Sequence, residues 1–246
     1  METLFIRPPA PAELLPQNAE LPNPQEALDL VALNARFRRL DPFNRVLEVF
    51  GMFRPEEILV TSSFGITSGV LLGMVSKAAP GHPVHFIDTT YHFPETLAYK
   101  EQLRERLRLN IVTLRPDPAK NAHSRDSELW KTAPDDCCHI NKVEALEPVK
   151  KRHRVWISGL MADQSDTRRA MGIFSQKPGD LLKFHPFLDW SQYEALLYLM
   201  VNELPQHPLM EQGYDSVGCT HCTQPGECRM GRWAQFAGKT ECGLHL

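Results

Sequence analysis

The 246-residue chain lacks the marks of several large protein classes. Its longest apolar stretches, 69–75 and 195–201, fall far short of the roughly 20 residues that a membrane-spanning helix needs. Its formal net charge is −3, so it has no excess of basic residues of the kind that binds nucleic acid. Residues 1–25 show neither the basic region nor the apolar core of a secretory signal. We therefore expect a soluble cytoplasmic protein with neither a membrane nor a nucleic acid as partner.

The composition is that of an ordinary globular chain. Hydrophobic residues make up 42% and charged residues 23%, which excludes a disordered, collagen-like or coiled-coil protein. Residues 1–25 contain six prolines and are predicted to form an irregular N-terminal arm. Residues 26–246 are predicted to form one domain, whose tail at about 219–246 is rich in glycine and cysteine.

Short β-branched runs alternate with helical segments along this domain. Helical periodicity covers 27–50, as one or two helices with a break at Asp41-Pro42, and it recurs in three later segments that end near 75, at 107 and at 204. Strands are predicted at 58–60, 83–88, 110–114 and 155–160. Such alternation predicts an α/β fold with a doubly wound, mostly parallel sheet. Ligands of such sheets bind at the carboxyl ends of the strands.

The first predicted strand leads into a loop of small hydroxyl residues and glycines, residues 61–69. Backbone N–H groups there are suited to cradle a phosphate, and the hydroxyls of Ser62, Ser63 and Thr67 add donors. The loop is not a Walker A motif, because no Gly-Lys-Ser/Thr sequence follows. The alternative is a tight glycine turn capped by serine.

Cysteine is absent from the first 136 residues, and the sequence then has an adjacent pair, Cys137-Cys138, and a Cys219-x-x-Cys222 motif. In a reducing cytosol, metal binding or redox chemistry is favoured over structural disulfides. Zinc, an iron–sulfur cluster and redox-active thiols all remain open on spacing alone. Adjacent side chains diverge, so the separate iron corners of a cubane cluster suit Cys137-Cys138 better than one tetrahedral ion does.

A further cysteine, Cys242, lies close to the C-terminal residue of the sequence. A thiol in a mobile end segment can move between a bound substrate and an external reductant. A protonated His245 would lower the pKa of this thiol. The alternative is an incidental surface cysteine.

Basic residues gather near the expected ligand end of the sheet. The forked guanidinium of arginine suits phosphate and sulfate. The alternative for any one of these residues is a place on a solvated basic surface. The basic residues in question are Lys142, Arg168, Arg169, Arg229 and Arg232.

Several separated motifs, taken together, resemble one known family over roughly residues 35–246. They are Ser62-Ser63-Phe64-Gly65-Ile66, Asp88-Thr89 with Phe93-Pro94-Glu95-Thr96, Trp156-x-x-Gly159, Asp163-Gln164-Ser165 with Thr167-Arg168, His207-Pro208-Leu209, Gly213-Tyr214, Ser216-Val217-Gly218 and Glu241-Cys242-Gly243-Leu244-His245. The chain resembles the sulfonucleotide reductases, the adenylyl-sulfate (APS) and phosphoadenylyl-sulfate (PAPS) reductases of sulfate assimilation. The resemblance implies an adenine-nucleotide α-hydrolase-like fold.

The resemblance also implies a thiol mechanism. Cys242 would attack the sulfate sulfur and form an S-sulfocysteine, from which reduced thioredoxin or glutaredoxin would release sulfite. The phosphosulfate would lie over the Ser62–Thr67 loop, and adenine would lie near residues 87–89. The substrate-binding residues would be Ser62, Ser63, Gly65, Thr67, Ile87, Thr89, Lys142, Arg168, Arg229, Arg232 and His245.

Cysteine content divides this family. Members with the Cys-Cys and Cys-x-x-Cys motifs carry a [4Fe–4S] cluster and mostly reduce APS, so the resemblance implies a cluster on Cys137, Cys138, Cys219 and Cys222. Lys142 occupies that branch's cluster-side lysine position. The Ser62–Ile66 loop is closer to that of PAPS reductases, and PAPS therefore stays as an alternative substrate. Cys228 has no counterpart and is interpreted as a spare thiol or a substitute ligand.

Two functions from other classes remain as rivals. An ATP-pyrophosphatase of the same fold would hold zinc on its CxxC motif, but its loop carries an aspartate where this chain has Thr67. A non-enzymatic iron–sulfur or zinc sensor would not need Cys242. The sequence leaves homo-oligomer formation open.

Overall fold

The computed structural model describes residues 29–177, 179–236 and 238–244. The predicted N-terminal arm and His245 lie outside these residues, and what was predicted for them stays a prediction. Among the described helices, none is long and apolar enough to cross a membrane.

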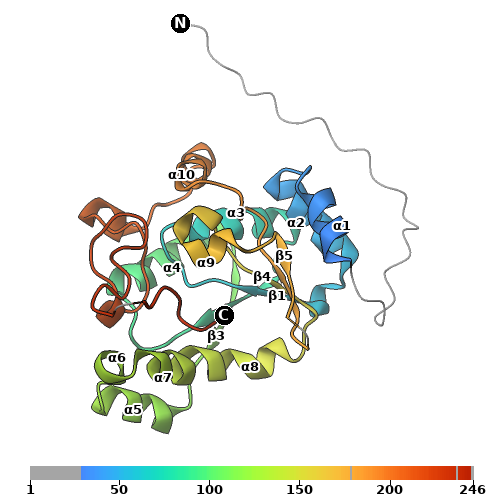
Figure 1. Ribbon diagram of the computed structural model, residues 1–246. Helices are drawn as coiled ribbons and strands as arrows, with labels where there is room; N and C mark the ends of the chain where they lie inside the picture. Colours follow the sequence, from blue (N-terminus) through green and yellow to red (C-terminus); the bar gives the residue numbers. More distant parts are fainter. Residues whose placement is uncertain (1–28, 178, 237, 245–246) are drawn as a thin grey trace, which may run out of the picture.

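One six-stranded sheet forms the centre of the molecule (Figure 1), with strand order β3-β2-β1-β4-β6-β5. The pairings from β3 through β6 are parallel, and only β5 runs antiparallel to its neighbour. The strands are β1 (Ile58–Thr61), β2 (Pro83–Ile87), β3 (Asn110–Leu114), β4 (Val155–Ile157), β5 (Phe174–Ser175) and β6 (Leu182–Phe184). The predicted doubly wound, mostly parallel sheet is therefore confirmed, although β5 and β6 were not predicted.

The helices begin and end at ordinary sequence signals. The predicted break before Pro42 is confirmed, because Asp41 accepts hydrogen bonds from the backbone N–H groups of Phe43 and Asn44 and so starts a second helix. The α-helices are α1 (Leu30–Phe37), α2 (Pro42–Met52), α3 (Ser68–Ala78), α4 (Pro94–Leu107), α5 (Pro118–Asp126), α6 (Leu129–Thr132), α7 (Pro134–Cys138), α8 (Glu144–Lys150), α9 (Asp166–Arg169) and α10 (Gln192–Val201). A π-helical turn, His139–Val143, joins α7 to α8.

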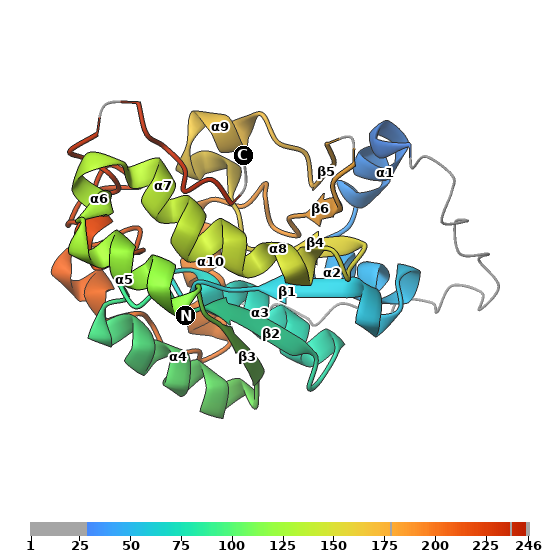
Figure 2. The same cartoon turned by 90° about the horizontal axis from the view of Figure 1, so that it is seen from below.

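Alternate residues of each strand face opposite sides of the sheet. Val60 of β1 contributes to a large core shared with α2, α3, α4 and α10. Its neighbour Leu59 packs on the other side with Trp156 and with Leu146 of α8. Figure 2 shows α8 crossing one side of the sheet while α3 and α4 lie on the other. Helices on both faces explain why β4 and the first three residues of β1 are all apolar.

The direction of winding reverses between β1 and β4. From β1 the chain proceeds outward through β2 and β3, and then β4 pairs with the opposite edge of β1. The loops that follow β1 and β4 therefore diverge and leave a crevice at the carboxyl ends of these strands, where doubly wound sheets bind their ligands.

Candidate active site

A cavity of ≈ 180 Å³ occupies this crevice. Its walls come from the loops after β1, β2 and β4, from the π-helical turn and from the C-terminal segment. The described members of the predicted site all line it: Ser62, Ser63, Gly65, Thr67, Ile87, Thr89, Lys142, Arg168, Arg229, Arg232 and Cys242. Arg169 does not take part, because it is exposed on α9 and pairs with Asp166.

The loop after β1 is held by its own side chains. Phe64 has a left-handed backbone (φ 52°), and its fully buried ring lies 5.5 Å from that of Phe86. The backbone N–H of Phe64 donates to the Ser62 hydroxyl at 3.1 Å. Thr67 precedes the first residue of α3 and forms no side-chain cap, and it lines the cavity together with Ser68 at the N-terminal end of the helix. This geometry suits an anion.

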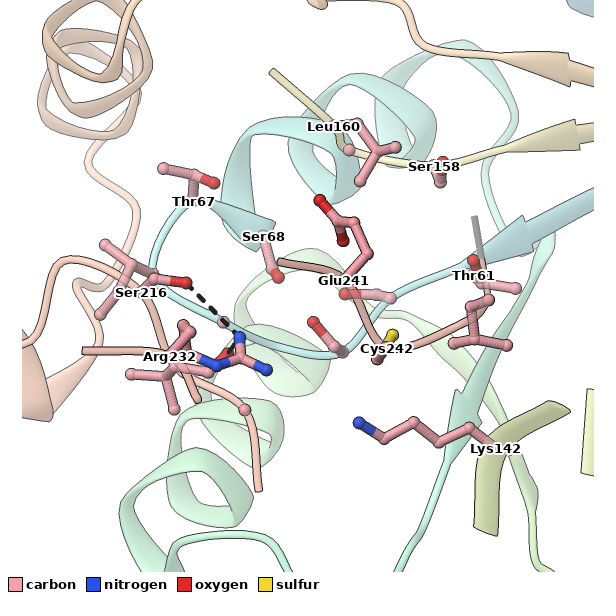
Figure 3. A pocket seen from close by; sticks show the side chains of 18 of the residues that line it. Thr61, Thr67, Ser68, Lys142, Ser158, Leu160, Ser216, Arg232, Glu241 and Cys242 are labelled. Carbon is pink, nitrogen blue, oxygen red and sulfur yellow. Dashed lines mark hydrogen bonds between the residues drawn. The ribbon is translucent and has the colours of Figure 1, made fainter. Parts of the chain in front are cut away.

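Arg232 and Lys142 bring positive charge into the cavity from opposite sides, as Figure 3 shows. The Arg232 guanidinium lies over the Trp233 ring, 4.4 Å from the ring centroid, and Nη1 donates to the carbonyl of Val217 at 3.3 Å. Neither cation forms an ion pair with a carboxylate of the described chain. Both remain available to a bound anion.

Arg168 and Arg229 line the same cavity, but both pair with Glu241. Arg168 donates from Nε at 2.6 Å and from Nη2 at 3.0 Å, and Arg229 Nη2 lies 3.3 Å from the same carboxylate. The sequence predicted both arginines as substrate ligands and assigned no role to Glu241. Burial raises the pKa of Glu241, but hydrogen bonding and charge from Arg168 outweigh it, so that the pKa is lowered.

Cys242 follows Glu241 and is half-buried in the cavity wall. Burial raises the pKa of its thiol, yet the positive charge of Lys142, a backbone hydrogen bond from Leu244 and the charge of Arg232 together bring the pKa below its ordinary value. Burial lowers the pKa of Lys142, but the nearby thiolates, Cys219 and Cys242 first among them, raise it above its ordinary value. The two groups therefore stabilise each other's charged forms.

The other four predicted cysteines converge next to this cavity. Cys137 and Cys138 end α7, Cys219 precedes a short 3₁₀ turn that ends at Cys222, and all four are buried. They line one small enclosed space together with Tyr91, Trp130, Asn141, Lys142 and His221. The described side chains contain no group of three or more His, Cys, Asp or Glu residues arranged to hold a single metal ion.

Hydrogen-bonding groups lie next to two of these sulfurs. The Cys137 sulfur lies 3.6 Å from Ser124 Oγ and 3.6 Å from Asn141 Nδ2, and the Cys219 sulfur lies 3.6 Å from Thr89 Oγ1. Burial raises the pKa of Cys138 to about 12 and that of Cys222 to about 11. Without a compensating positive charge these buried thiols would stay protonated. Sequence reasoning missed Ser124 and Asn141, whose roles depend on contacts across α5 and the π-helical turn.

The comparison with known proteins agrees with this geometry. Residues 57–225 match the phosphoadenosine phosphosulfate reductase domain. The chain belongs to the phosphoadenosine phosphosulfate reductase family. It is 36% identical over 228 residues to the adenosine 5'-phosphosulfate reductase of Shouchella clausii (strain KSM-K16), covering 89% of this chain and 94% of that one. The resemblance seen in the sequence is thereby confirmed.

Solved structures of lower identity confirm the fold of this family member. The PAPS reductase of Candida auris superposes with a TM-score of 0.68 at 24% identity, covering 81% of this chain and 99% of that one. The FMN adenylyltransferase of Candida glabrata superposes with a TM-score of 0.55 at 16% identity, covering 82% of this chain and 69% of that one. These likenesses confirm the predicted adenine-nucleotide α-hydrolase-like architecture.

Proposed function

We propose that this reductase-family chain reduces APS to sulfite and AMP in sulfate assimilation. The observation that carries the proposal is one cavity that combines a half-buried thiol, Cys242, with two unpaired cations, Lys142 and Arg232, opposite the loop after β1. Family membership supports the substrate class, and the curated relative from Shouchella clausii is named for this reaction.

In the proposed reaction the Cys242 thiolate attacks the sulfate sulfur. A bond forms between Sγ and this sulfur, and the bond from the sulfur to the phosphate oxygen breaks, so that AMP leaves. A dithiol reductant, thioredoxin or glutaredoxin, then attacks Sγ of the S-sulfocysteine and releases sulfite. Its second thiol resolves the mixed disulfide, and the dithiol supplies the two electrons. Lys142 and Arg232 offset the negative charge that collects on the departing oxygens.

The nucleotide end of the substrate is assigned to the loops after β1 and β2. Ser62, Ser63 and Thr67 would donate to phosphate oxygens, with Gly65 allowing close approach, and adenine would pack near Ile87 and Thr89. These positions line the cavity, and the hydroxyls and the N-terminal end of α3 meet there. His245 remains a proposed contributor to the charge around Cys242.

The charge of the cavity favours APS over PAPS. Its walls carry four cations against two carboxylates and the Cys242 thiolate, a formal surplus of one positive charge; these groups are Lys142, Arg168, Arg229, Arg232, Asp215, Glu241 and Cys242. A phosphosulfate carries one negative charge on phosphate and one on sulfate, so APS exceeds this surplus by only one charge. The 3′-phosphate of PAPS would add up to about two further negative charges. PAPS stays as the alternative because of the Ser62–Ile66 loop.

We further propose that Cys137, Cys138, Cys219 and Cys222 hold a [4Fe–4S] cluster. Four buried thiols line one small space, and hydrogen-bonding groups lie 3.6 Å from two of the sulfurs, which supports joint ligation of one cluster by the four thiolates. When bound, the cluster would supply a fixed charge beside Lys142, because the thiol chemistry needs no electron from it. Lys142 lines both this space and the substrate cavity, so it would link the two.

The experiment that tests the proposal compares sulfite release from APS and from PAPS at equal low concentration with reduced thioredoxin. The proposal predicts strong preference for APS. A preference for PAPS would assign specificity to the Ser62–Ile66 loop instead of the charge balance. Sulfite from neither substrate, together with pyrophosphate release from ATP, would overturn the reductase assignment in favour of an ATP-pyrophosphatase.

A further inference from the structure

Side chains of α7 and α9 hold the C-terminal segment that carries Cys242 against the rest of the domain. Lys239 forms an ion pair with Asp135 of α7, and the hydroxyls of Thr240 and Thr167 of α9 lie 3.4 Å apart. The carbonyl of Thr240 also accepts from Arg229 Nη2 at 2.9 Å. In Figures 1 and 2 this red segment runs between α7 and α9.

The strongest of these ties is the pair of Arg168 and Glu241. Glu241 is 3% exposed and Arg168 is 6% exposed, and their contact is bidentate. The Ser165 hydroxyl also donates to Glu241, at 3.3 Å. Breaking one partner of a buried pair leaves an uncompensated charge, so this contact resists local opening of the segment.

The protein itself uses every nitrogen of the Arg168 guanidinium. Nε and Nη2 donate to Glu241, and Nη1 donates to the side-chain oxygen of Gln164. These contacts use three of the five N–H groups of the guanidinium, so a substrate oxygen could reach Arg168 only through the second N–H of Nη1 or Nη2, on a nitrogen that the protein already holds. By contrast, Nε of Arg229 has no acceptor, and Lys142 pairs with no carboxylate in the described part of the chain.

We propose that Arg168 and Glu241 are positioning residues: together they anchor the Cys242 segment to the cavity, and Arg168 acts on the reaction through Glu241 instead of binding substrate. The proposal rests on the proposed function for the role of Cys242. The anchor itself is a property of the fold, and its test does not require turnover.

The first measurement is trypsin cleavage after Lys239, followed by mass spectrometry of the released 240–246 peptide. The side chain of Lys239 is 7% exposed and pairs with Asp135, so trypsin can bind it only after the side chain leaves this place. Glu241→Gln and Arg168→Gln are each expected to speed cleavage by about tenfold or more, because each removes one side of a buried pair. The double variant should add nothing further, since both changes break the same contact. Unchanged cleavage in both single variants would overturn the anchor.

Two further variants separate anchoring from a general effect. Glu227→Gln removes an exposed carboxylate from the same region and should leave cleavage after Lys239 unchanged. Arg168→Lys keeps the charge but loses the bidentate fork, and its cleavage rate should lie between those of wild type and Arg168→Gln. Melting followed by circular dichroism would show that each variant keeps its fold.

The second measurement is APS binding by calorimetry in a Cys242→Ser background, where no sulfur transfer can occur. The proposal predicts that Arg168→Gln changes APS affinity by less than about twofold, because Arg168 is not a substrate ligand. Loss of affinity by about tenfold or more on Arg168→Gln would make Arg168 a direct ligand and overturn its assignment. If the anchor holds but no variant or wild type releases sulfite, the proposed function fails and the anchor stands.

Discussion

The guanidinium of Arg232 lies directly against the backbone of Gly218. A Cβ atom at position 218 would sit 2.3 Å from Nη2 and 2.5 Å from Cζ, so a side chain there would have to push the guanidinium away. The guanidinium also lies over the Trp233 ring, 4.4 Å from the ring centroid. Gly218 and Trp233 together therefore fix the position of one of the two unpaired cations.

Gly218→Ala is expected to weaken AMP binding by about tenfold, since Arg232 must leave its place to accommodate the methyl group. Calorimetric titration with AMP measures this change. Gly51→Ala is the matched control, because a Cβ there meets nothing within 4 Å and the position is helical. The control should stabilise the fold by about 0.5–1 kcal/mol and leave AMP binding unchanged. Equal AMP affinity in the two variants would refute this role of Arg232.

Lys142→Gln is expected to raise the pKa of Cys242, because Lys142 is the first of the groups that lower it. The pH at which alkylation of Cys242 reaches half its maximal rate should increase by about one unit or more. Alkylation followed by peptide mass spectrometry measures this, in a Cys228→Ser background because Cys228 is exposed. Lys120→Gln, which removes an exposed lysine paired with Glu144, should cause no such shift. A midpoint that stays in place in the Lys142 variant would contradict the proposed coupling.

Anaerobically purified protein is expected to be brown and to contain about four irons per chain, as a [4Fe–4S] thiolate centre requires. Serine in place of Cys137, Cys138, Cys219 or Cys222 should remove the colour and most of the iron. Cys228→Ser should retain both, because Cys228 is exposed and does not line the cysteine-walled space. Colourless wild-type protein with one zinc per chain would show that the cysteines hold a single ion.

Two buried histidines should make the fold sensitive to acid. Burial lowers the pKa of His185 to about 4 and that of His207 to about 4, below the value of about 6.5 expected in the unfolded chain. The unfolded state therefore binds protons that the folded state does not bind, and the free energy of unfolding falls as pH drops from about 6.5 toward 4. Each histidine contributes up to about a tenfold change in the folding equilibrium per pH unit.

Urea unfolding at a series of pH values tests this account. His207→Gln should flatten the pH dependence of stability between about pH 6 and 4, while His123→Gln, on the exposed side of α5, serves as the control. If stability depended on pH as steeply in the His207 variant as in wild type, His207 would not contribute to the acid sensitivity.

The central strands were predictable because their signal is local. Ile58-Leu59-Val60 is apolar on both faces, and a parallel strand covered by helices on both sides has this pattern. Strand β5 was not predicted because it is only two residues long, and β6 was not predicted because Lys183 interrupts its three residues, whereas the equally short β4 is apolar throughout. Nothing within so short a window distinguishes such a strand from a loop.

The site residues, too, were predictable where their signal is local and not where it depends on distant contacts. Cys242 and the Ser62 loop were found from local motifs, whereas the role of Glu241 depends on Arg168, 73 positions away in the sequence. A carboxylate in a polar tail carries no local sign that it will be buried between two arginines. The sequence therefore predicted which residue types meet in the cavity, but not that Glu241 pairs with Arg168 and Arg229.

The most direct test of the account is the mass of the Cys242 peptide after incubation with APS in the absence of reductant. The proposed mechanism predicts that one sulfonate group is added to Cys242, that one AMP is released per chain, and that reduced thioredoxin then removes the sulfonate as sulfite. An unmodified Cys242 peptide in protein that nevertheless releases sulfite would contradict the proposed role of this thiol.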